Sequence, residues 1–517
     1  MRLERKRPAC PRVFEANALR CRKYRIVKEA FASKTRGQAG RLRSSHYREN
    51  MRRVFLDLLI VFTISLISFS NTFGQSKNEV LIKNATVLTA ARGTLENTDI
   101  LIQNGKIARI GKNLSASSSA KIIDATGRFV APGIIDAHSH AMMDAINEGT
   151  LAVTSMTRIR DVLNPGDISI YRALASGVTA ANLLHGSANP IGGQNSTVKF
   201  KWGKPVEDFI VADAPSGIKF AMGENTKRSS FNPQGGQTPR YPRTRMGTLE
   251  VIRDAFNRAR DYKQSWDDFK AKKTKIPPRT DIELQPLVEI LEGKRLVHAH
   301  GYRSDEHLNL LKLADEFGFR IASLQHGLEA YKIAPEIAKR KTGVSIFADS
   351  WSYKLEAYDS IPYNAYILWK NGVNVSINSD SDERIRRLNL DAAKVMKYGG
   401  VPEEDALKMI TLNPAMQLGI DKRTGSIEVG KDADLAIWTA HPFSVYSRVD
   451  MTLIEGDTYF DRSKETQMRA DLQKERDALE KLEVNKAPGS GGTPPRIPAE
   501  KRLADRDEAD RDGGNYK

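Results

Sequence analysis

The chain has 517 residues, of which 40% are hydrophobic and 7% aromatic, a composition typical of globular proteins that excludes wholesale disorder. Its formal charge is +17, but residues 1–50 alone hold 15 Lys and Arg against 4 Asp and Glu. The charge of the remainder is ordinary for a globular domain, so we expect no nucleic-acid partner.

Residues 51–75 have the pattern of a secretory signal peptide: Met51 and two arginines, the 12-residue apolar run 58–69, then a small polar exit. A membrane-spanning helix needs about 20 apolar residues, so a membrane anchor formed by an uncleaved signal is the alternative. Because a signal peptide is N-terminal, we interpret residues 1–50 as a basic extension from an upstream start-site over-assignment. The mature protein would then be secreted or periplasmic, with no stable membrane insertion. It would also lack the two cysteines of the chain, Cys10 and Cys21, and hence any disulfide or cysteine zinc site.

Short alternating segments with Gly and Asn-Gly turns predict strands on both sides of a long middle region. On the N-terminal side they lie at 79–84, 85–90, 100–103, 106–110 and 121–124, and on the C-terminal side at 435–439 and 449–455. We therefore predict a small β-sandwich formed from both chain ends, residues 76–131 and 425–460.

Between these ends, residues 132–424 alternate strand-like apolar runs with helical stretches. The predicted strands are 177–184, 217–222, 295–299, 319–324, 344–347 and 373–377, and the predicted helices include 249–263, 305–316 and 335–341. This repetition predicts an α/β fold with a parallel sheet, and its length suits a (β/α)8 TIM barrel. Residues 225–248 are predicted to be a surface insertion, and residues 461–517 a charged helix followed by a disordered tail.

His138 and His140 directly follow the apolar run 133–135. Side chains two apart on a strand point the same way, so both imidazoles would face one space. Imidazole is a common metal ligand, and the alternative is a pair of polar histidines satisfied by other partners.

Three further polar residues come at the ends of predicted strands: His300, His326 and Asp380. The intervals of 26 and 54 residues between them match one and two βα units of a barrel. Strand 1 would then carry His138 and His140, strand 5 His300, strand 6 His326 and strand 8 Asp380. All would be at the C-terminal ends of the strands, where barrel active sites are found.

With these motifs in order, the sequence resembles the metal-dependent amidohydrolase superfamily, in its imidazolonepropionase-like and Xaa-Pro dipeptidase-like branch. The resemblance covers residues 79 to about 460. It is carried by the segments VAPGIIDAHSH at 130–140, HGSANPIGGQ at 185–194, VHAHG at 297–301, QHG at 325–327, NSDSD at 378–382, TLNPA at 411–415 and GSIEVGKDAD at 425–434.

The resemblance implies a distorted barrel with a β-sandwich from both chain ends, and one or two divalent metal ions, zinc being favoured. His138 and His140 would bind the buried metal, and Asp380 would bind it and act as general base. His300 and His326 would bind a second metal or, in one-metal relatives, position and polarise the substrate.

The resemblance does not identify which residue would bridge two metal ions. Lys219, as a carboxylated lysine, and Glu224 are the two candidates, and the alternative is that neither binds metal. Tyr302 and Arg303 follow His300 and are candidate substrate-binding residues, since an arginine there could hold a substrate carboxylate. His185 and His298 are expected to be non-ligands, and His307 is expected to be exposed on its helix.

We therefore expect an exported hydrolase that cleaves a C–N bond of an amide, peptide or cyclic amide with metal-activated water. Its substrate would be a small molecule or short peptide, and a homo-oligomer is left open. One alternative is a metal-dependent deaminase of a small heterocycle, although the acidic residues after His300, Asp305 and Glu306, lie further along than in deaminases. The other is a catalytically inactive amidohydrolase-like binding protein.

Overall fold

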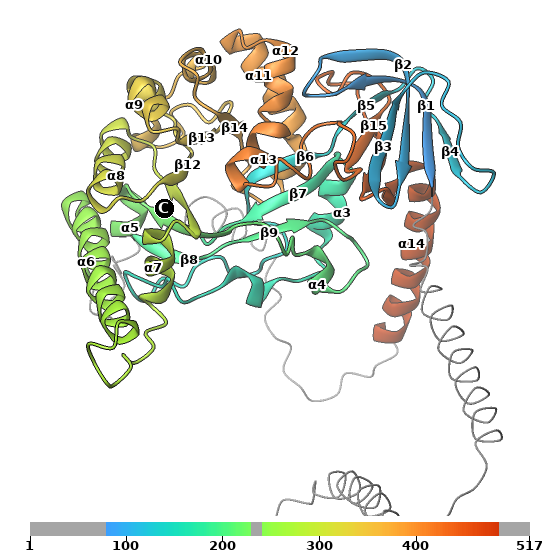
Figure 1. Cartoon of the computed structure of the whole chain (residues 1–517). Coiled ribbons are helices and arrows are strands. Elements are labelled where there is room, and N and C mark those ends of the chain that lie inside the picture. Colours follow the sequence, from blue (N-terminus) through green and yellow to red (C-terminus); the bar gives the residue numbers. More distant parts are fainter. Residues whose placement is uncertain (1–78, 229–239, 485–517) are drawn as a thin grey trace, which may run out of the picture. The chain divides into compact units, whose positions relative to one another are not determined.

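The computed structural model describes residues 79–228 and 240–484 (Figure 1). These residues belong to one compact unit, Ser76–Lys517. The predicted basic extension, signal peptide and distal tail lie outside the described residues, as does the middle of the predicted insertion. Within the described ranges, no helix combines the length and the apolar character that crossing a membrane requires.

One sheet of eight strands draws on both ends of the described chain, in the order β17-β16-β15-β5-β1-β2-β3, with β4 paired to β1. Val130 on β5 pairs antiparallel with Ile437 on β15. The predicted Asn104-Gly105 turn joins β2 to β3, and both residues have the positive φ that such a turn needs. The strands are β1 Val80–Leu88, β2 Thr94–Gln103, β3 Lys106–Gly111, β4 Lys121–Asp124, β5 Phe129–Pro132, β15 Leu435–Trp438, β16 Val449–Ile454 and β17 Asp457–Asp461.

Parallel strands of the middle region form two further sheets, which confirms a mixed α/β fold. In the six-stranded sheet β10 to β14 are parallel neighbours, with β8 antiparallel at the edge; in the three-stranded sheet β6 and β7 are parallel, with β9 antiparallel to β7. The strands are β6 Ile134–Ser139, β7 Val178–Leu183, β8 Ile191–Gln194, β9 Ser196–Lys199, β10 Ser216–Ala221, β11 Arg295–His300, β12 Ile321–Gln325, β13 Gly343–Ile346 and β14 Val375–Ile377.

The segment from β8 to β9 joins these two sheets. Only Asn195 separates the strands, so the chain runs on in one direction, antiparallel to β10 along β8 and antiparallel to β7 along β9. A parallel connection needs a crossover of a dozen or more residues. A single residue cannot supply one, so this part of the middle region departs from strict strand–helix alternation.

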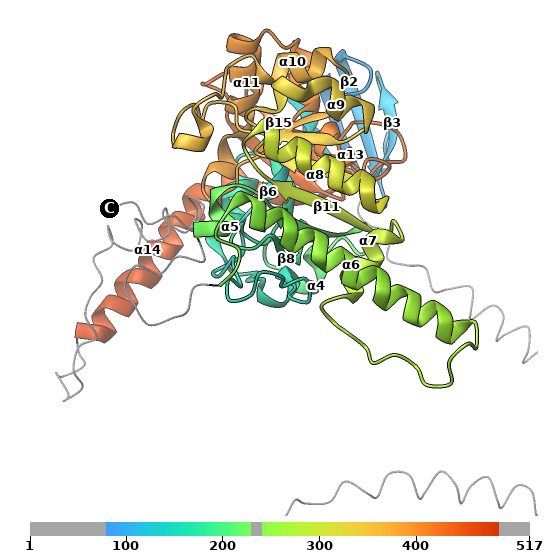
Figure 2. The same ribbon diagram turned by 90° about the vertical axis from the view of Figure 1, so that its left-hand side faces the viewer.

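Helices cover the outside of the parallel strands (Figures 1 and 2). The longest of them, α6, starts after Thr244, whose hydroxyl accepts a hydrogen bond from Gly247 N. Phe256 on its buried face stacks on Phe319 with ring centroids 4.5 Å apart. The helices are α3 Ile168–Leu174, α4 Val206–Phe209, α5 Glu224–Arg228, α6 Arg245–Lys270, α7 Gln285–Leu291, α8 Ser304–Phe317, α9 Ala334–Lys339, α10 Asn364–Lys370, α11 Leu388–Gly399, α12 Glu403–Lys408, α13 Leu412–Leu418 and α14 Arg462–Val484, with 3-10 turns η1 Ile159–Val162, η2 Ala330–Ile333, η3 Leu355–Ala357 and η4 Arg384–Arg387.

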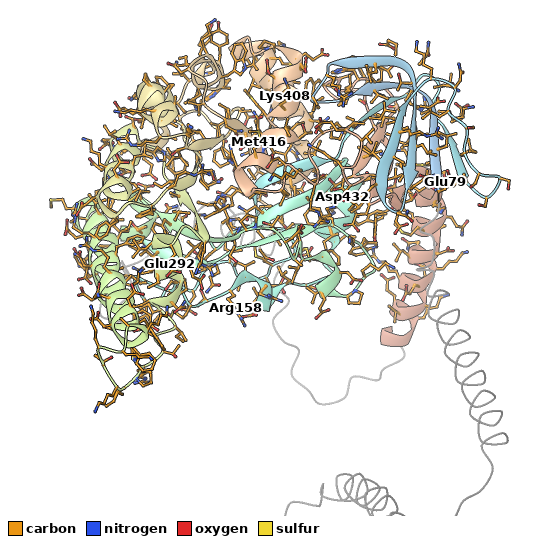
Figure 3. All side chains as sticks on the ribbon, viewed as in Figure 1. Glu79, Arg158, Glu292, Lys408, Met416 and Asp432 are labelled. Carbon is orange, nitrogen blue, oxygen red and sulfur yellow. The ribbon has the colours of Figure 1, made fainter. Side chains whose placement is uncertain are left out.

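A buried ion cluster connects β9 to the eight-stranded sheet. Lys199 Nζ lies 2.7 Å from Asp432 Oδ2, 2.9 Å from Asp434 Oδ2 and 3.2 Å from Glu455 Oε1; Asp432 is labelled in Figure 3. Burial disfavours the charged amine, but the three carboxylates raise the pKa of Lys199 above its ordinary value. The lysine is therefore charged and fully paired.

Candidate metal centre

Five predicted site residues come together at the C-terminal ends of parallel strands. His138 lies on β6 and His140 directly follows it, His300 ends β11, His326 follows β12, and Asp380 lies three residues beyond β14. All five side chains are buried. The structure thus places them where the strand spacing predicts.

Asp380 is at the middle of this group. Its Oδ1 lies 3.0 Å from Nε2 of both His138 and His140, and its Oδ2 lies 3.4 Å from His326 Nε2. The His300 and His326 rings have centroids 5.0 Å apart. Ligand atoms of His138, His140 and Asp380 all lie within 4.8 Å of one another, close enough to hold one metal ion.

Two of these residues have an unusual backbone conformation. Asp380 and His326 have φ values of 50° and 57°, which are uncommon for residues other than glycine and concentrate at functional sites. Asp380 N also donates to His138 O at 2.9 Å. The segment after β14 is thereby fixed against β6.

The protonation states suit a divalent cation. Burial, together with the nearby Lys219 amine, lowers the pKa of His138 to about 3, so the imidazole is neutral. Burial alone would raise the pKa of Asp380, but His326 and His138 hold it well below its usual range. The neutral imidazole of His138 and the ionised carboxylate of Asp380, with the His140 imidazole beside them, match the nitrogen and oxygen donors that zinc and similar ions bind.

The two candidate bridging residues are placed differently. Lys219, on β10, is buried, with Nζ 3.3 Å from His138 Nε2 and 3.1 Å from His185 O. Glu224 begins α5, and its backbone N–H donates to Glu356 Oε2 at 3.1 Å. The Lys219 amine therefore lies within contact distance of a metal-site histidine.

Of the two candidate substrate-binding residues, Tyr302 lies at the site. It is fully buried, its ring centroid is 4.9 Å from that of His300, and its hydroxyl accepts a hydrogen bond from Tyr353 at 2.6 Å. The Arg303 side chain is 43% exposed and pairs with Asp305 at 2.9 Å. Its guanidinium is engaged on the first turn of α8.

His298 and His185 have partners outside the group of five. His298 Nδ1 lies 2.8 Å from Ser323 Oγ, and His185 Nε2 accepts a hydrogen bond from Glu148 N at 2.8 Å. The prediction that His307 is exposed is wrong. Its side chain is fully buried, because the ring fills the space beside Gly301, where a Cβ atom would lie 2.9 Å from it.

Sequence reasoning missed several residues around the centre. Asp136 accepts hydrogen bonds from His138 N and Ser379 N, both at 3.1 Å, and from Ser379 Oγ at 2.5 Å. Asn225 Nδ2 lies 3.4 Å from His300 Nε2. Asp136 could have been found, because it lies two residues before His138 on the same strand. Asn225, in the predicted insertion, gave no such signal.

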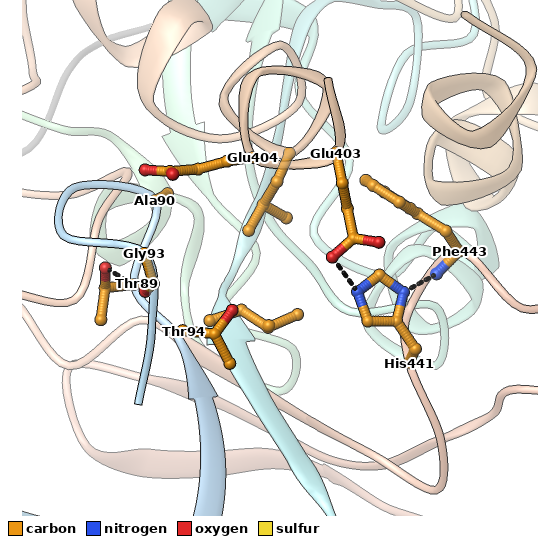
Figure 4. Close-up of a pocket in the computed structure, with 10 residues that line it drawn as sticks. Thr89, Ala90, Gly93, Thr94, Glu403, Glu404, His441 and Phe443 are labelled. Carbon is orange, nitrogen blue, oxygen red and sulfur yellow. Dashed lines mark hydrogen bonds and ion pairs between the residues drawn. The ribbon is translucent and has the colours of Figure 1, made fainter. Parts of the chain in front are cut away.

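A separate cavity of about 100 Å³ lies between the turn 89–94, α12 and the segment that follows β15 (Figure 4). There His441 Nδ1 accepts a hydrogen bond from Phe443 N at 3.3 Å, and its Nε2 lies 3.2 Å from Glu403. None of the five candidate metal-site residues lines this cavity.

Comparisons with known proteins find amidohydrolases. A model of the amidohydrolase family matches residues 294–459, a range that contains His300, His326 and Asp380. The crystal structure of an amidohydrolase from Thermotoga maritima is 37% identical, covers 74% of this chain and all of its own, and superposes with a TM-score of 0.69. Amidohydrolase tasK from Hapsidospora irregularis is 31% identical over 75% of this chain, which spans only 45% of that longer protein. Imidazolonepropionase from Thermoplasma volcanium is 23% identical over 72% of this chain and 92% of its own length.

Proposed function

Because the chain belongs to the amidohydrolase family, whose members hydrolyse C–N bonds, we propose that it cleaves a small amide, peptide or cyclic amide with a divalent metal ion, zinc being favoured. The observation that carries the proposal is the buried group of His138, His140 and Asp380, with two Nε2 atoms 3.0 Å from one carboxylate oxygen. We also propose that the six-stranded and the three-stranded sheet, joined through β8 and β9, make the (β/α)8 barrel of this family.

The chemistry divides between the ion and the chain. When bound, a divalent ion acts as a Lewis acid that makes water nucleophilic near neutral pH. Asp380, ionised in the folded chain, takes the proton that the attacking water loses and returns it to the leaving nitrogen as the C–N bond breaks. His300 and His326 hold a second ion or, with one ion, orient the substrate carbonyl. Tyr302, packed on His300, limits where the substrate lies.

Metal content is the first test. We expect one or two zinc ions per full-length chain purified without chelator, measured by elemental mass spectrometry. Two ions would support a bridge by carboxylated Lys219 or by Glu224, and one would assign substrate orientation to His300 and His326. No metal, even after reconstitution, would contradict the proposal.

Activity tests the role of Asp380. Against a library of dipeptides and cyclic amides, Asp380→Asn should lower kcat by about 100- to 10,000-fold, the range for loss of a general base. Asp315→Asn, an equal change at an exposed position on α8, is the matched control. Full activity of Asp380→Asn would show that the measured activity does not depend on this site, and would support the alternative of a catalytically inactive amidohydrolase-like binding protein. Release of ammonia from a heterocycle in place of amide cleavage would support the deaminase alternative.

Residues 51–75, outside the described part of the chain, support a further proposal that the protein is exported and its signal peptide removed. N-terminal sequencing of the protein recovered from cells should find a start near residue 75. A start at Met51 or earlier would favour retention of the signal as an anchor.

A further inference from the structure

Two buried carboxylates meet beside Gly223, the second residue after β10. They belong to Glu306 on α8 and Glu356 on η3, and their side chains are 4% and 2% exposed. A Cβ atom at Gly223 would lie 3.0 and 3.5 Å from the two oxygens of Glu356 and 3.3 Å from Glu306 Oε2. Three carboxylate oxygens therefore converge on one point, and any residue larger than glycine would crowd them.

This carboxylate pair adjoins the candidate metal centre. Met222, the residue before Gly223, donates its N–H to His300 O at 2.9 Å. Lys354 Nζ lies 3.5 Å from Glu356 Oε1 and 4.2 Å from the centroid of the Tyr302 ring, which packs on His300. The pair is thus linked to His300 both through β10 and through Tyr302.

The cations around the pair leave one acceptor unused. Arg245 pairs with Glu306 Oε1 and lies 3.4 Å from Glu356 Oε2. Glu306 Oε2 accepts no hydrogen bond from any residue in the ranges 79–228 and 240–484. Burial and the nearby Glu356 carboxylate outweigh the opposing Arg245 and raise the pKa of Glu306 to about 7. A buried acceptor without a donor is costly, and a ligand that brings a donor removes that cost.

Resting on the proposed hydrolase function, we propose that the substrate carries a cationic group, an ammonium or a guanidinium, that binds Glu306 and Glu356 while its amide lies at the metal centre. N–H donors of such a group match the acceptor that Glu306 Oε2 offers, and a charged donor makes the stronger bond. The substrate class is then a basic amide: a peptide with a free amine, or one with a lysine- or arginine-like side chain.

Direct binding tests this without hydrolysis. By calorimetry on the metal-loaded full chain, n-butylguanidinium should bind more tightly than butyrate or butanol. Glu306→Gln should weaken its binding about tenfold or more, the value of one charged hydrogen bond. Glu316→Gln, on the same helix with a side chain 49% exposed, is the control and should not change the binding. If Glu306→Gln does not fold, as judged by circular dichroism, Glu356→Gln replaces it. Equal binding of butanol, or tighter binding of butyrate, by the unmodified protein would overturn the proposal.

Kinetic measurements distinguish a failure of the cationic-substrate proposal from a failure of the proposed hydrolase function. Matched amides that differ only in lysine against norleucine, or in a free against an acetylated amine, should give kcat/KM ratios of about 10 or more in favour of the cation. Glu306→Gln should lower that ratio. If amides are cleaved without such preference, the result supports the hydrolase function and contradicts the proposal that the substrate is cationic. If Glu306→Gln loses guanidinium binding but the unmodified protein cleaves no amide, the result supports the cation site and contradicts the hydrolase function.

Discussion

Three buried histidines couple the stability of this protein to pH. Burial lowers the pKa of His185 and His307 to about 4 and that of His298 to about 3, from an ordinary 6.5. Below pH 6.5 the unfolded chain binds protons at these rings while the folded chain does not. Their contribution is therefore complete above pH 6.5 and is lost as the pH falls from 6.5 toward 4.

We expect the free energy of unfolding to fall by about 2 kcal/mol for each of these histidines between pH 6.5 and pH 5, since one pKa unit corresponds to about 1.4 kcal/mol. Denaturant titrations at several pH values measure this slope. His307→Gln should reduce the fall in the free energy of unfolding by the contribution of one histidine. An unchanged slope in that variant would show that His307 titrates normally in the folded chain.

At the scale of elements, the candidate metal centre depends on hydrogen bonds that hold β6 against the segment after β14. Asp136 accepts from the backbone of both, at His138 N and Ser379 N, and so sets Asp380 against the two histidines. Asp136→Asn should lower metal affinity about 10- to 100-fold, as loss of a group that orients ligands does. Competition with a chelator measures the affinity, and Asp124→Asn, whose side chain bonds Thr126 at the surface, is the control. Unchanged affinity would show that the backbone alone positions Asp380.

Elements also show what the sequence could and could not predict. Strand ends marked by His138, His300, His326 and Asp380 were predictable, because apolar strands repeat at regular spacing and their C-terminal ends meet. The β8–β9 segment was not predictable, because an antiparallel run of a few residues has no periodicity that distinguishes it. Glu356 was missed for a related reason: its side chain reaches Gly223 and Glu306 from the short 3-10 turn η3, and the position of such a short turn depends on tertiary contacts.

Over the whole molecule, the Lys199 cluster joins a strand of the three-stranded sheet to carboxylates of the eight-stranded sheet. Removing the amine would leave the buried Asp432 and Asp434 and the half-buried Glu455 with less compensating charge. Lys199→Met should therefore cost about 3–5 kcal/mol, as breaking a buried ion pair does, measured by denaturant unfolding. Lys201→Met is the control, because Lys201 is less buried and, among the residues that the structure describes, forms an ion pair only with Glu455. Equal losses in both variants would contradict a special role for Lys199.

The pairing of β5 with β15 has a consequence for synthesis. Strand β5 leaves the ribosome roughly 300 residues before its partner β15, as the pairing of Val130 with Ile437 shows, and such distant contacts form late. Until then the edge of β5 is open to strands of other chains. Aggregation of the nascent protein, rather than loss of catalysis, is therefore the first failure to look for in versions shortened before Leu435.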